Sequence, residues 1–213
     1  SKRMNIPVFH DDQHGTAIIS SAALLNALEL VGKRIGEVKL VASGAGAAAI
    51  ACLDLMVGLG VKPSNIFVCD SKGVIQTERA DAVGGKLDES KQRYCRTTTA
   101  RTLADAVNAA DVFLGCSAPG VLTADMVKTM KPGSVIVDIA IDQGGCIESI
   151  RPTSHLKPVY RDFGVIHYAV PNMPALVGRT STLGLTQATE PYVAMLVSKG
   201  IEHALAEHQG LQR

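Results

Sequence analysis

The feature that most limits how this chain can fold is a short glycine-containing segment between two apolar runs. Residues 41–51 read Val-Ala-Ser-Gly-Ala-Gly-Ala-Ala-Ala-Ile-Ala. A strand that turns into a helix through such residues lets backbone amides approach a pyrophosphate, and the helix N-terminus favours negative charge. The alternative is an ordinary strand–helix turn whose small residues serve only packing. We predict that the small residues of this turn bind a dinucleotide: Gly44, Gly46, Ala47, Ala48 and Ala49.

A second motif follows one strand later. Asp70 ends the apolar run 65–69, and a carboxylate there can accept hydrogen bonds from the hydroxyls of a ribose. Ser71 and Lys72 come next and belong to the same predicted cofactor site. Lys72 favours a 2′-phosphate, whereas Asp70 favours a 2′-hydroxyl, repels phosphate and is nearer the expected ribose. The sequence therefore predicts NAD as the cofactor, with NADP as the alternative.

Apolar runs alternate with helical patterns over most of the chain, which is typical of a parallel sheet with crossover helices. We predict an α/β fold, a Rossmann-type doubly wound parallel sheet, in a single domain covering residues 1–213. Residues 73–100 are expected to be polar and irregular, with one or two helical turns. The predicted helices are 16–31, 47–60, 103–109, 123–130 and 180–206, the last interrupted near Gly200. The predicted strands are 38–42, 66–70, 111–115, 134–140 and 164–168.

Composition argues against several other classes of protein. Trp is absent, aromatic residues make up 4% of the chain, and 21 basic residues balance 20 acidic ones. No aromatic platform or overall positive field is thus available for nucleic acid or acidic lipid. The five cysteines are an odd number without any Cys-x-x-Cys pair, which favours reduced thiols. With no run of about 18 apolar residues and no signal-peptide core, we expect a cytoplasmic protein without a membrane partner.

The first part of the chain carries several specific motifs. Residues 5–16 read Asn-Ile-Pro-Val-Phe-His-Asp-Asp-Gln-His-Gly-Thr, which resembles the signature that opens the cofactor domain of bacterial malic enzymes, and the likeness runs on to residue 27. It continues through Gly-Ala-Gly-Ala-Ala at 44–48, Cys-Asp-Ser-Lys-Gly-Val-Ile at 69–75 and Gly-Cys-Ser-Ala-Pro-Gly-Val-Leu-Thr at 115–123. The resemblance covers about residues 4–125 and implies a domain that binds NAD or NADP.

The second part resembles a different family. Residues 130–146, including Lys-Pro-Gly-Ser-Val-Ile-Val-Asp-Ile-Ala-Ile-Asp-Gln-Gly-Gly, are similar to the C-terminal half of the nucleotide domain of alanine dehydrogenase. The same family is indicated by Arg-Pro-Thr-Ser-His at 151–155, Asn-Met-Pro at 172–174 and Arg-Thr-Ser-Thr at 179–182. This likeness covers about residues 126–209, and 123–130 suits either family. We therefore hypothesise an engineered or recombined chimera of two Rossmann halves.

The malic enzyme resemblance implies one ligand of a metal site. In that family three carboxylates hold Mg²⁺ or Mn²⁺, which prefers oxygen ligands, and Asp12 matches one of them. The other two belong to a region upstream of residue 1, so the site is expected to be incomplete and to bind metal only if completed. The alternative is an acidic loop that leads into a helix, with His10 and His14 as polar loop residues.

The resemblances also suggest residues beside the nicotinamide. Asp142 matches the aspartate that alanine dehydrogenases use in catalysis, although a turn residue before two glycines is the alternative. Asn172 and Met173 match the loop next to the nicotinamide in that family. Ser117, Ala118 and Pro119 resemble the loop after the fourth strand, which flanks the path of the cofactor; a Pro-Gly turn is the alternative.

These observations predict an NAD(P)-binding Rossmann module that derives from oxidoreductases and lacks a substrate domain. The alternative is an active oxidoreductase, with malate dehydrogenase (oxaloacetate-decarboxylating) ahead of alanine dehydrogenase. A third reading is a fold that binds no cofactor. Apolar side chains on both terminal helices predict a homodimer that forms through them. These side chains are Leu24, Leu25 and Leu28 near the N-terminus and Tyr192, Met195 and Leu196 near the C-terminus.

Overall fold

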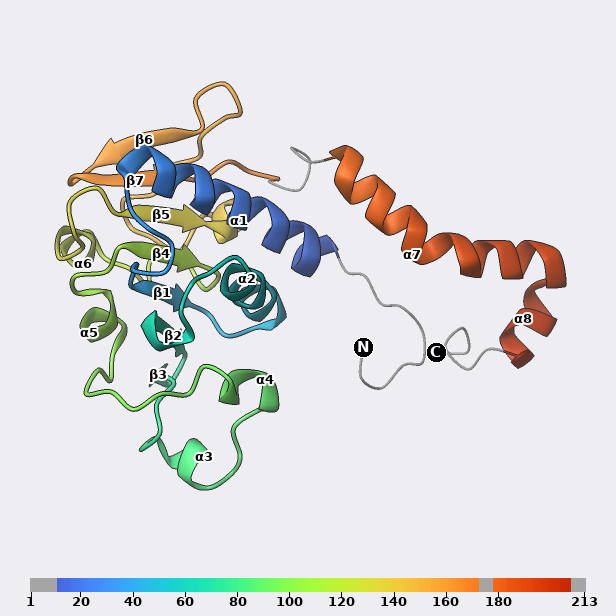
Figure 1. Ribbon diagram of the computed structural model, residues 1–213, viewed down its shortest axis with the longest axis horizontal. Helices are drawn as coiled ribbons and strands as arrows, with labels where there is room; N and C mark the ends of the chain where they lie inside the picture. Colours follow the sequence, from blue (N-terminus) through green and yellow to red (C-terminus); the bar gives the residue numbers. More distant parts are fainter. Residues whose placement is uncertain (1–10, 173–177, 208–213) are drawn as a thin grey trace.

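A seven-stranded sheet forms the centre of the protein (Figure 1). The computed structural model describes residues 11–172 and 178–207. The strand order is β3-β2-β1-β4-β5-β7-β6, in which β2, β1, β4, β5 and β7 run parallel and both edge strands run antiparallel to their neighbours. The strands are β1 (Leu40–Ser43), β2 (Ile66–Asp70), β3 (Gly73–Val74), β4 (Val112–Gly115), β5 (Val135–Asp138), β6 (Val159–Asp162) and β7 (Val165–Tyr168). This confirms the predicted Rossmann-type fold.

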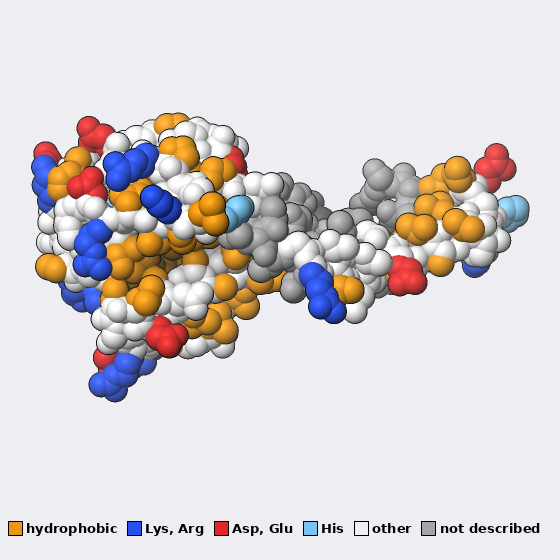
Figure 2. All heavy atoms as spheres, turned by 90° about the horizontal axis from the view of Figure 1, so that it is seen from above, with side chains coloured by type: hydrophobic (Ala, Val, Ile, Leu, Met, Phe, Trp, Pro, Cys, Tyr) orange, Lys and Arg blue, Asp and Glu red, His pale blue; other side chains and the backbone are white. Residues whose placement is uncertain are grey.

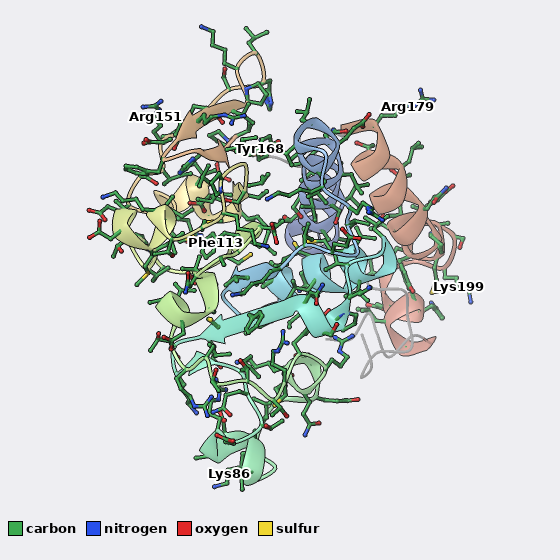
Figure 3. The ribbon with its side chains drawn as sticks, turned by 60° about the vertical axis from the view of Figure 1, so that its left-hand side comes forward. Lys86, Phe113, Arg151, Tyr168, Arg179 and Lys199 are labelled. Carbon is green, nitrogen blue, oxygen red and sulfur yellow. The ribbon has the colours of Figure 1, made fainter. Side chains whose placement is uncertain are left out.

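Successive side chains of the central strands point to opposite faces, so each strand contributes to two hydrophobic clusters. Leu40, Ala42 and Leu114 pack with α1 (Asp11–Val31) and α2 (Ala47–Gly58). Val41 and Phe113 pack with α5 (Leu103–Val107) and α6 (Ala124–Lys128), and Figure 3 marks Phe113 within this cluster. Because both faces are covered, the central strands are continuous apolar runs.

The sheet edges differ from the sequence-based expectation. Strand β6 was not predicted, because its four side chains alternate between exposed and half-buried and it lacks the apolar run of a central strand. The segment 73–100 contains the expected helical turns, α3 (Ala80–Val83) and α4 (Glu89–Gln92), and also the short strand β3, which was not predicted. Two short 3-10 helices complete the elements of the sheet region, η1 (Pro63–Asn65) and η2 (Ile139–Gln143).

Helix α1 begins at Asp11 and not at Thr16, so the prediction that Asp11, Asp12 and His14 lie in a loop is wrong. Acidic residues near a helix N-terminus are favourable because they complement the helix dipole, which explains why the helix extends through them. His10 lies outside the described residues. Leu24 and Leu28 are buried, and the Ser20 hydroxyl contacts the Cys52 thiol of α2 at 3.4 Å. Helix α1 therefore packs against α2 on one face of the sheet.

One window of α1 also has the length and composition of a membrane span. Within the described residues, Gln13–Val31 has a mean hydropathy of 1.3, and 44% of it is buried in the protein. A core helix that packs on neighbouring elements passes the same test as a membrane helix, so this property does not separate the two.

The C-terminal part consists of α7 (Gly178–Lys199) and α8 (Ile201–Glu207), separated by Gly200 in a left-handed conformation with φ +76°. The predicted interruption near Gly200 is thus confirmed. Helix α7 extends away from the sheet (Figure 1), and Arg179 and Lys199 mark its two ends in Figure 3. Several apolar side chains of these helices are exposed, among them Leu183, Val193 and Val197.

Candidate functional site

The turn from β1 into α2 lies beside the carboxyl end of β4, where the strand order reverses direction. Ligands of open α/β sheets bind in the crevice at such a switch point. The Cys116 amide donates to the Ser43 carbonyl at 2.8 Å, and the Ser43 and Ser117 hydroxyls lie 2.7 Å apart. Ala118 and Pro119 follow on an exposed loop. The structure thus brings the predicted loop 117–119 to the same edge as the glycine turn.

The two glycines of the turn serve different purposes. Gly44 has φ +106°, its amide donates to the Cys69 carbonyl at 2.8 Å, and a Cβ there would lie 2.3 Å from the Cys116 carbonyl oxygen. Gly44 is therefore required by the close approach of two protein segments, a reason that the sequence alone did not reveal. A Cβ at Gly46 would meet no atom within 4 Å. Gly46 is thus the glycine that faces open space.

The N-terminus of α2 is open to solvent. Gly46 is its N-cap, no side chain caps it, and its first turn holds no acidic residue. The first amides of a helix have no partner within the helix and carry partial positive charge, so this end attracts anions. Gly46 and Ala47 are exposed and Ala48 is half-buried, whereas Ala49 is buried against the sheet. The arrangement fits a diphosphate at Gly46–Ala48, with Ala49 as the packing residue.

Asp70 ends β2 at the same edge, but its carboxylate is already paired within the protein. The Arg79 guanidinium donates to both Asp70 oxygens at 2.8 and 3.0 Å. The Lys72 amide donates to Oδ1 at 2.9 Å, and the Lys91 ammonium lies 3.5 Å from Oδ2. Arg79 also binds Asp81, with Nε 2.7 Å from Oδ1. These contacts occupy about four acceptor positions, the full capacity of a carboxylate.

Hydrogen bonds from neighbouring cations keep the Asp70 and Asp81 carboxylates ionised. Burial opposes ionisation of Asp70, but hydrogen bonds from Arg79 and the Lys72 amide outweigh it and hold the pKa of Asp70 below its usual value. Hydrogen bonding to Arg79 likewise lowers the pKa of Asp81 to about 2. Both carboxylates are thus ionised at neutral pH beside Arg79, Lys72 and Lys91, three cations against two anions. The local charge is positive by one.

Two further predicted residues meet at the end of the sheet. The Asn172 amide donates to the Asp142 carboxylate at 3.1 and 3.2 Å from its two oxygens. Asp142 is exposed in η2, and Asn172 follows β7 in a left-handed conformation with φ 51°. Met173 lies outside the described residues. The structure therefore joins Asp142 and Asn172 in one contact, on the exposed surface at this end.

The predicted metal ligand is only partly described. Asp12 lies in the first turn of α1, and its side chain is outside the described part. Within residues 11–172 and 178–207, no three His, Cys, Asp or Glu side chains lie together in a way that could hold a metal ion. The role of Asp12 remains a prediction.

Sequence reasoning missed Arg79, Asp81 and Lys91. Arg79 lies nine residues after Asp70, in a segment expected to be irregular, and only the antiparallel pairing of β3 with β2 turns the chain back toward Asp70. A basic residue shortly after an acidic strand end is the one signal that could have indicated this contact, and it is a weak one.

Comparison with known proteins identifies the family. The family model for the C-terminal domain of alanine dehydrogenase/PNT matches residues 19–213. The chain belongs to the alanine dehydrogenase/PNT C-terminal domain family. Within the curated proteins, the chain is 59% identical over 140 residues to the NADP-dependent malic enzyme of Haemophilus influenzae, covering 65% of this chain and 18% of that enzyme. It is 48% identical over 129 residues to the alanine dehydrogenase of Halomonas elongata, covering 57% of this chain and 35% of that enzyme.

A solved structure supports the same family relationship. An L-alanine dehydrogenase superimposes with a TM-score of 0.58 and 31% identity over 93% of this chain and 58% of the other. The family domain is thus related both to malic enzymes and to alanine dehydrogenases, as the two resemblances predicted. The chain spans less than a fifth of the length of the malic enzyme it matches.

Proposed function

We propose that this domain binds a nicotinamide dinucleotide in the crevice at the carboxyl ends of β1 and β4. The observation that carries this proposal is the uncapped, solvent-open N-terminus of α2, where space is free beside Gly46. The diphosphate would lie against the amides of Gly46, Ala47 and Ala48, and one ribose would lie toward β2. The nicotinamide would lie toward Ser117 and the Asp142–Asn172 contact, at the other end of the crevice.

Calorimetric titration with NAD⁺ and with NADP⁺ tests this proposal. Gly46→Ala places a methyl group in the space assigned to the diphosphate, so we expect at least tenfold weaker binding. Gly58→Ala is the matched control, because Gly58 ends the same helix and a Cβ there also meets no atom within 4 Å. A folded wild-type protein that gives no heat with either nucleotide contradicts the proposal, as does equal binding by both variants.

The cofactor choice depends on the Asp70 cluster. The sequence-based preference for NAD assumed a free Asp70 carboxylate, but Arg79 occupies both of its oxygens. A net positive charge from Asp70, Asp81, Arg79, Lys72 and Lys91 favours a 2′-phosphate. We therefore expect NADP⁺ to bind at least as tightly as NAD⁺, and a clear preference for NAD⁺ would support the original assignment.

The role of a binding module also remains a proposal. Hydride transfer requires a cofactor, a substrate and acid or base groups held together in a shielded site. Asp142 is the one predicted catalytic residue, and it is exposed and bound to a backbone amide. We expect no turnover of malate with Mg²⁺ or of alanine in the presence of NAD⁺ or NADP⁺. Sustained reduction of the nucleotide with either substrate would favour the oxidoreductase alternative.

We propose further that the chain joins two halves of different origin near residues 123–130, by engineering or by natural recombination. The matches to both enzyme families support this origin. An intact natural gene that encodes this run together with a substrate domain would contradict it.

Of the six apolar side chains that predicted a homodimer, Leu25 is exposed, Leu24 and Leu28 are buried, and Tyr192, Met195 and Leu196 are half-buried. Exposed apolar side chains of the terminal helices still support the homodimer. Leu25 on α1 and Leu183 on α7 are 40% and 53% exposed, and exposed apolar patches commonly mark interaction surfaces. Sedimentation at micromolar concentration tests this association directly. A purely monomeric protein would contradict it.

A further inference from the structure

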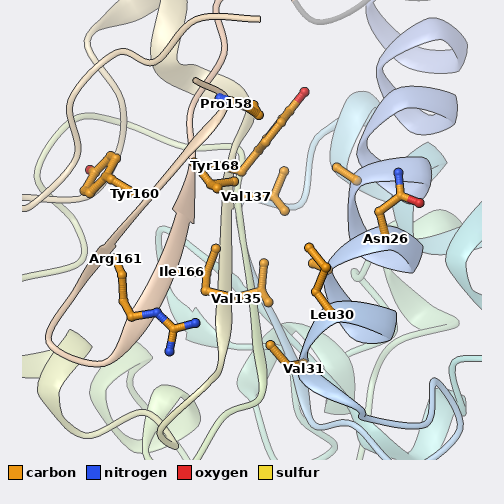
Figure 4. A pocket seen from close by; sticks show the side chains of 13 residues that line it. Asn26, Leu30, Val31, Val135, Val137, Pro158, Tyr160, Arg161, Ile166 and Tyr168 are labelled. Atoms are coloured by element: carbon orange, nitrogen blue, oxygen red, sulfur yellow. The ribbon is translucent and has the colours of Figure 1, made fainter. Parts of the chain in front are cut away.

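A deep apolar groove separates α1 from the β6–β7 edge of the sheet (Figure 4). Its volume is about 590 Å³. Figure 4 shows Leu30 of α1 and Ile166 of β7 directed toward each other across it, with Val135 between them. It is lined by Ala23, Asn26, Ala27, Leu30 and Val31 of α1, by Val135 and Val137 of β5, and by Pro158, Val159, Tyr160, Arg161, Ile166 and Tyr168 of the last hairpin.

The groove presents apolar surface that no other described element covers fully. Leu30 on one rim is 82% exposed and Val159 on the other is 47% exposed. Figure 2, viewed from the side of β6, β7 and α1, shows a hollow with hydrophobic side chains at its base. Apolar surface in a concave site rimmed by polar groups is typical of a place where another molecule or segment packs.

Helix α7 carries a complementary face. Leu183, Glu190, Val193 and Val197 are spaced by seven, three and four residues, so they lie along one side of the helix. Leu183, Val193 and Val197 are 53%, 55% and 82% exposed. The helix has 22 residues, about 33 Å along its axis, and Pro191 interrupts its hydrogen bonding between Glu190 and Val193. The stripe from Leu183 to Val197 covers about 21 Å of this length, and an exposed apolar surface of this kind commonly packs against a partner.

A pair of opposite charges would fix the position of α7 along the groove. Glu190 lies within the apolar stripe of α7 and is exposed, and Arg161 lies on the wall of the groove. A guanidinium beside an apolar groove can receive a carboxylate from an incoming helix as a bidentate pair. Val193 follows Glu190 by about one turn, which would bring it toward Leu30 and Ile166.

We infer that the groove between α1 and β6–β7 receives helix α7 of a second copy of this chain. This inference rests on the proposed homodimer and names the surfaces that form it. The chain's own α7 lies away from the groove in the structure (Figure 1), so a reciprocal exchange covers both grooves and both helix stripes at once. Stable interfaces bury a total of about 1,200–2,000 Å². Because the exchange is reciprocal, the dimer contains two helix–groove contacts, and both contribute to this total.

Cross-linking between two differently tagged copies tests the arrangement. One copy carries Leu30→Cys, the other carries Val193→Cys, and a short bis-maleimide joins thiols that lie close together. We expect a covalent heterodimer, well above the background that the native cysteines give in unmodified mixtures. A chain that carries both substitutions and cross-links only within itself, at monomer mass, would show that α7 folds onto its own groove and would overturn the inference.

Substitutions that introduce or reverse a charge give a second, independent test. Val193→Glu and Arg161→Glu should each weaken dimerisation at least tenfold in sedimentation equilibrium, and Glu190→Arg should restore it in the Arg161→Glu background. Leu156→Glu is the control, since Leu156 is 95% exposed and lies outside the groove. A dimer that survives all these substitutions would retain the proposed homodimer but refute the surfaces assigned here. A wild-type monomer would refute both.

Discussion

The structure makes a sharp prediction about Gly44, whose replacement tests why the turn contains two glycines. In Gly44→Ala the residue keeps a φ of +106°, which costs an L-amino acid about 1–3 kcal/mol. Its Cβ would lie 2.3 Å from the Cys116 carbonyl oxygen, a backbone atom that cannot rotate away. Overpacking of this kind adds about 1–3 kcal/mol.

We therefore expect Gly44→Ala to lower the free energy of unfolding by about 2–6 kcal/mol, a large share of the stability of a typical domain. Urea denaturation followed by circular dichroism measures this change, with the denaturant dependence unaltered if both states stay the same size. Gly46→Ala is the matched control: its Cβ meets open space and its φ is −80°, so we expect a loss of at most about 1 kcal/mol. A loss below about 1 kcal/mol for Gly44→Ala, or equal losses at both positions, would refute the reasoning.

Three further predictions follow from the charged and thiol groups. Arg79→Ala leaves Asp70 and Asp81 without their shared cation, so we expect the ratio of NADP⁺ to NAD⁺ affinity to fall at least tenfold in calorimetry. An unchanged ratio would show that this charged cluster does not determine the choice of cofactor. The carboxylate of buried Asp111 accepts hydrogen bonds from Lys33 at 2.9 Å and from Lys131 at 2.7 Å. Asp111→Ala should therefore lower the free energy of unfolding by about 1–3 kcal/mol, as measured by urea denaturation. An unchanged free energy of unfolding would show that these ion pairs contribute little. Although burial opposes ionisation, these hydrogen bonds hold the pKa of Asp111 below its usual value, so its contribution is complete above the unfolded pKa and is lost as the pH falls through the lower folded pKa. Burial raises the pKa of the Cys52 thiol to about 11, so iodoacetamide at pH 8 should leave Cys52 unmodified in the folded protein, as mass spectrometry of the digest would confirm or contradict.

The central part of the fold could be predicted from the sequence because the signals there are local. The predicted strand 66–70 matches β2 in both bounds, and the Gly-x-Gly-x-x-Ala turn connects β1 to α2 as expected. Thr123 caps α6 by accepting from the Met126 amide at 3.3 Å, a local contact that a threonine just before a helix favours. By contrast, β6 has half-exposed side chains and depends on its pairing with β7, so its own sequence carries little signal.

The candidate site shows the same division. The sequence by itself determined that a strand, a turn of small residues and an apolar helix would follow one another, because periodicity and residue size act over a few positions. Only the tertiary structure decided that Gly44 is needed against Cys116 and that Gly46 faces open space. It also decided that Arg79 neutralises Asp70, since this contact depends on how β3 returns the chain. Such contacts join residues whose separation along the chain says nothing about their distance in space, so no local pattern encodes them.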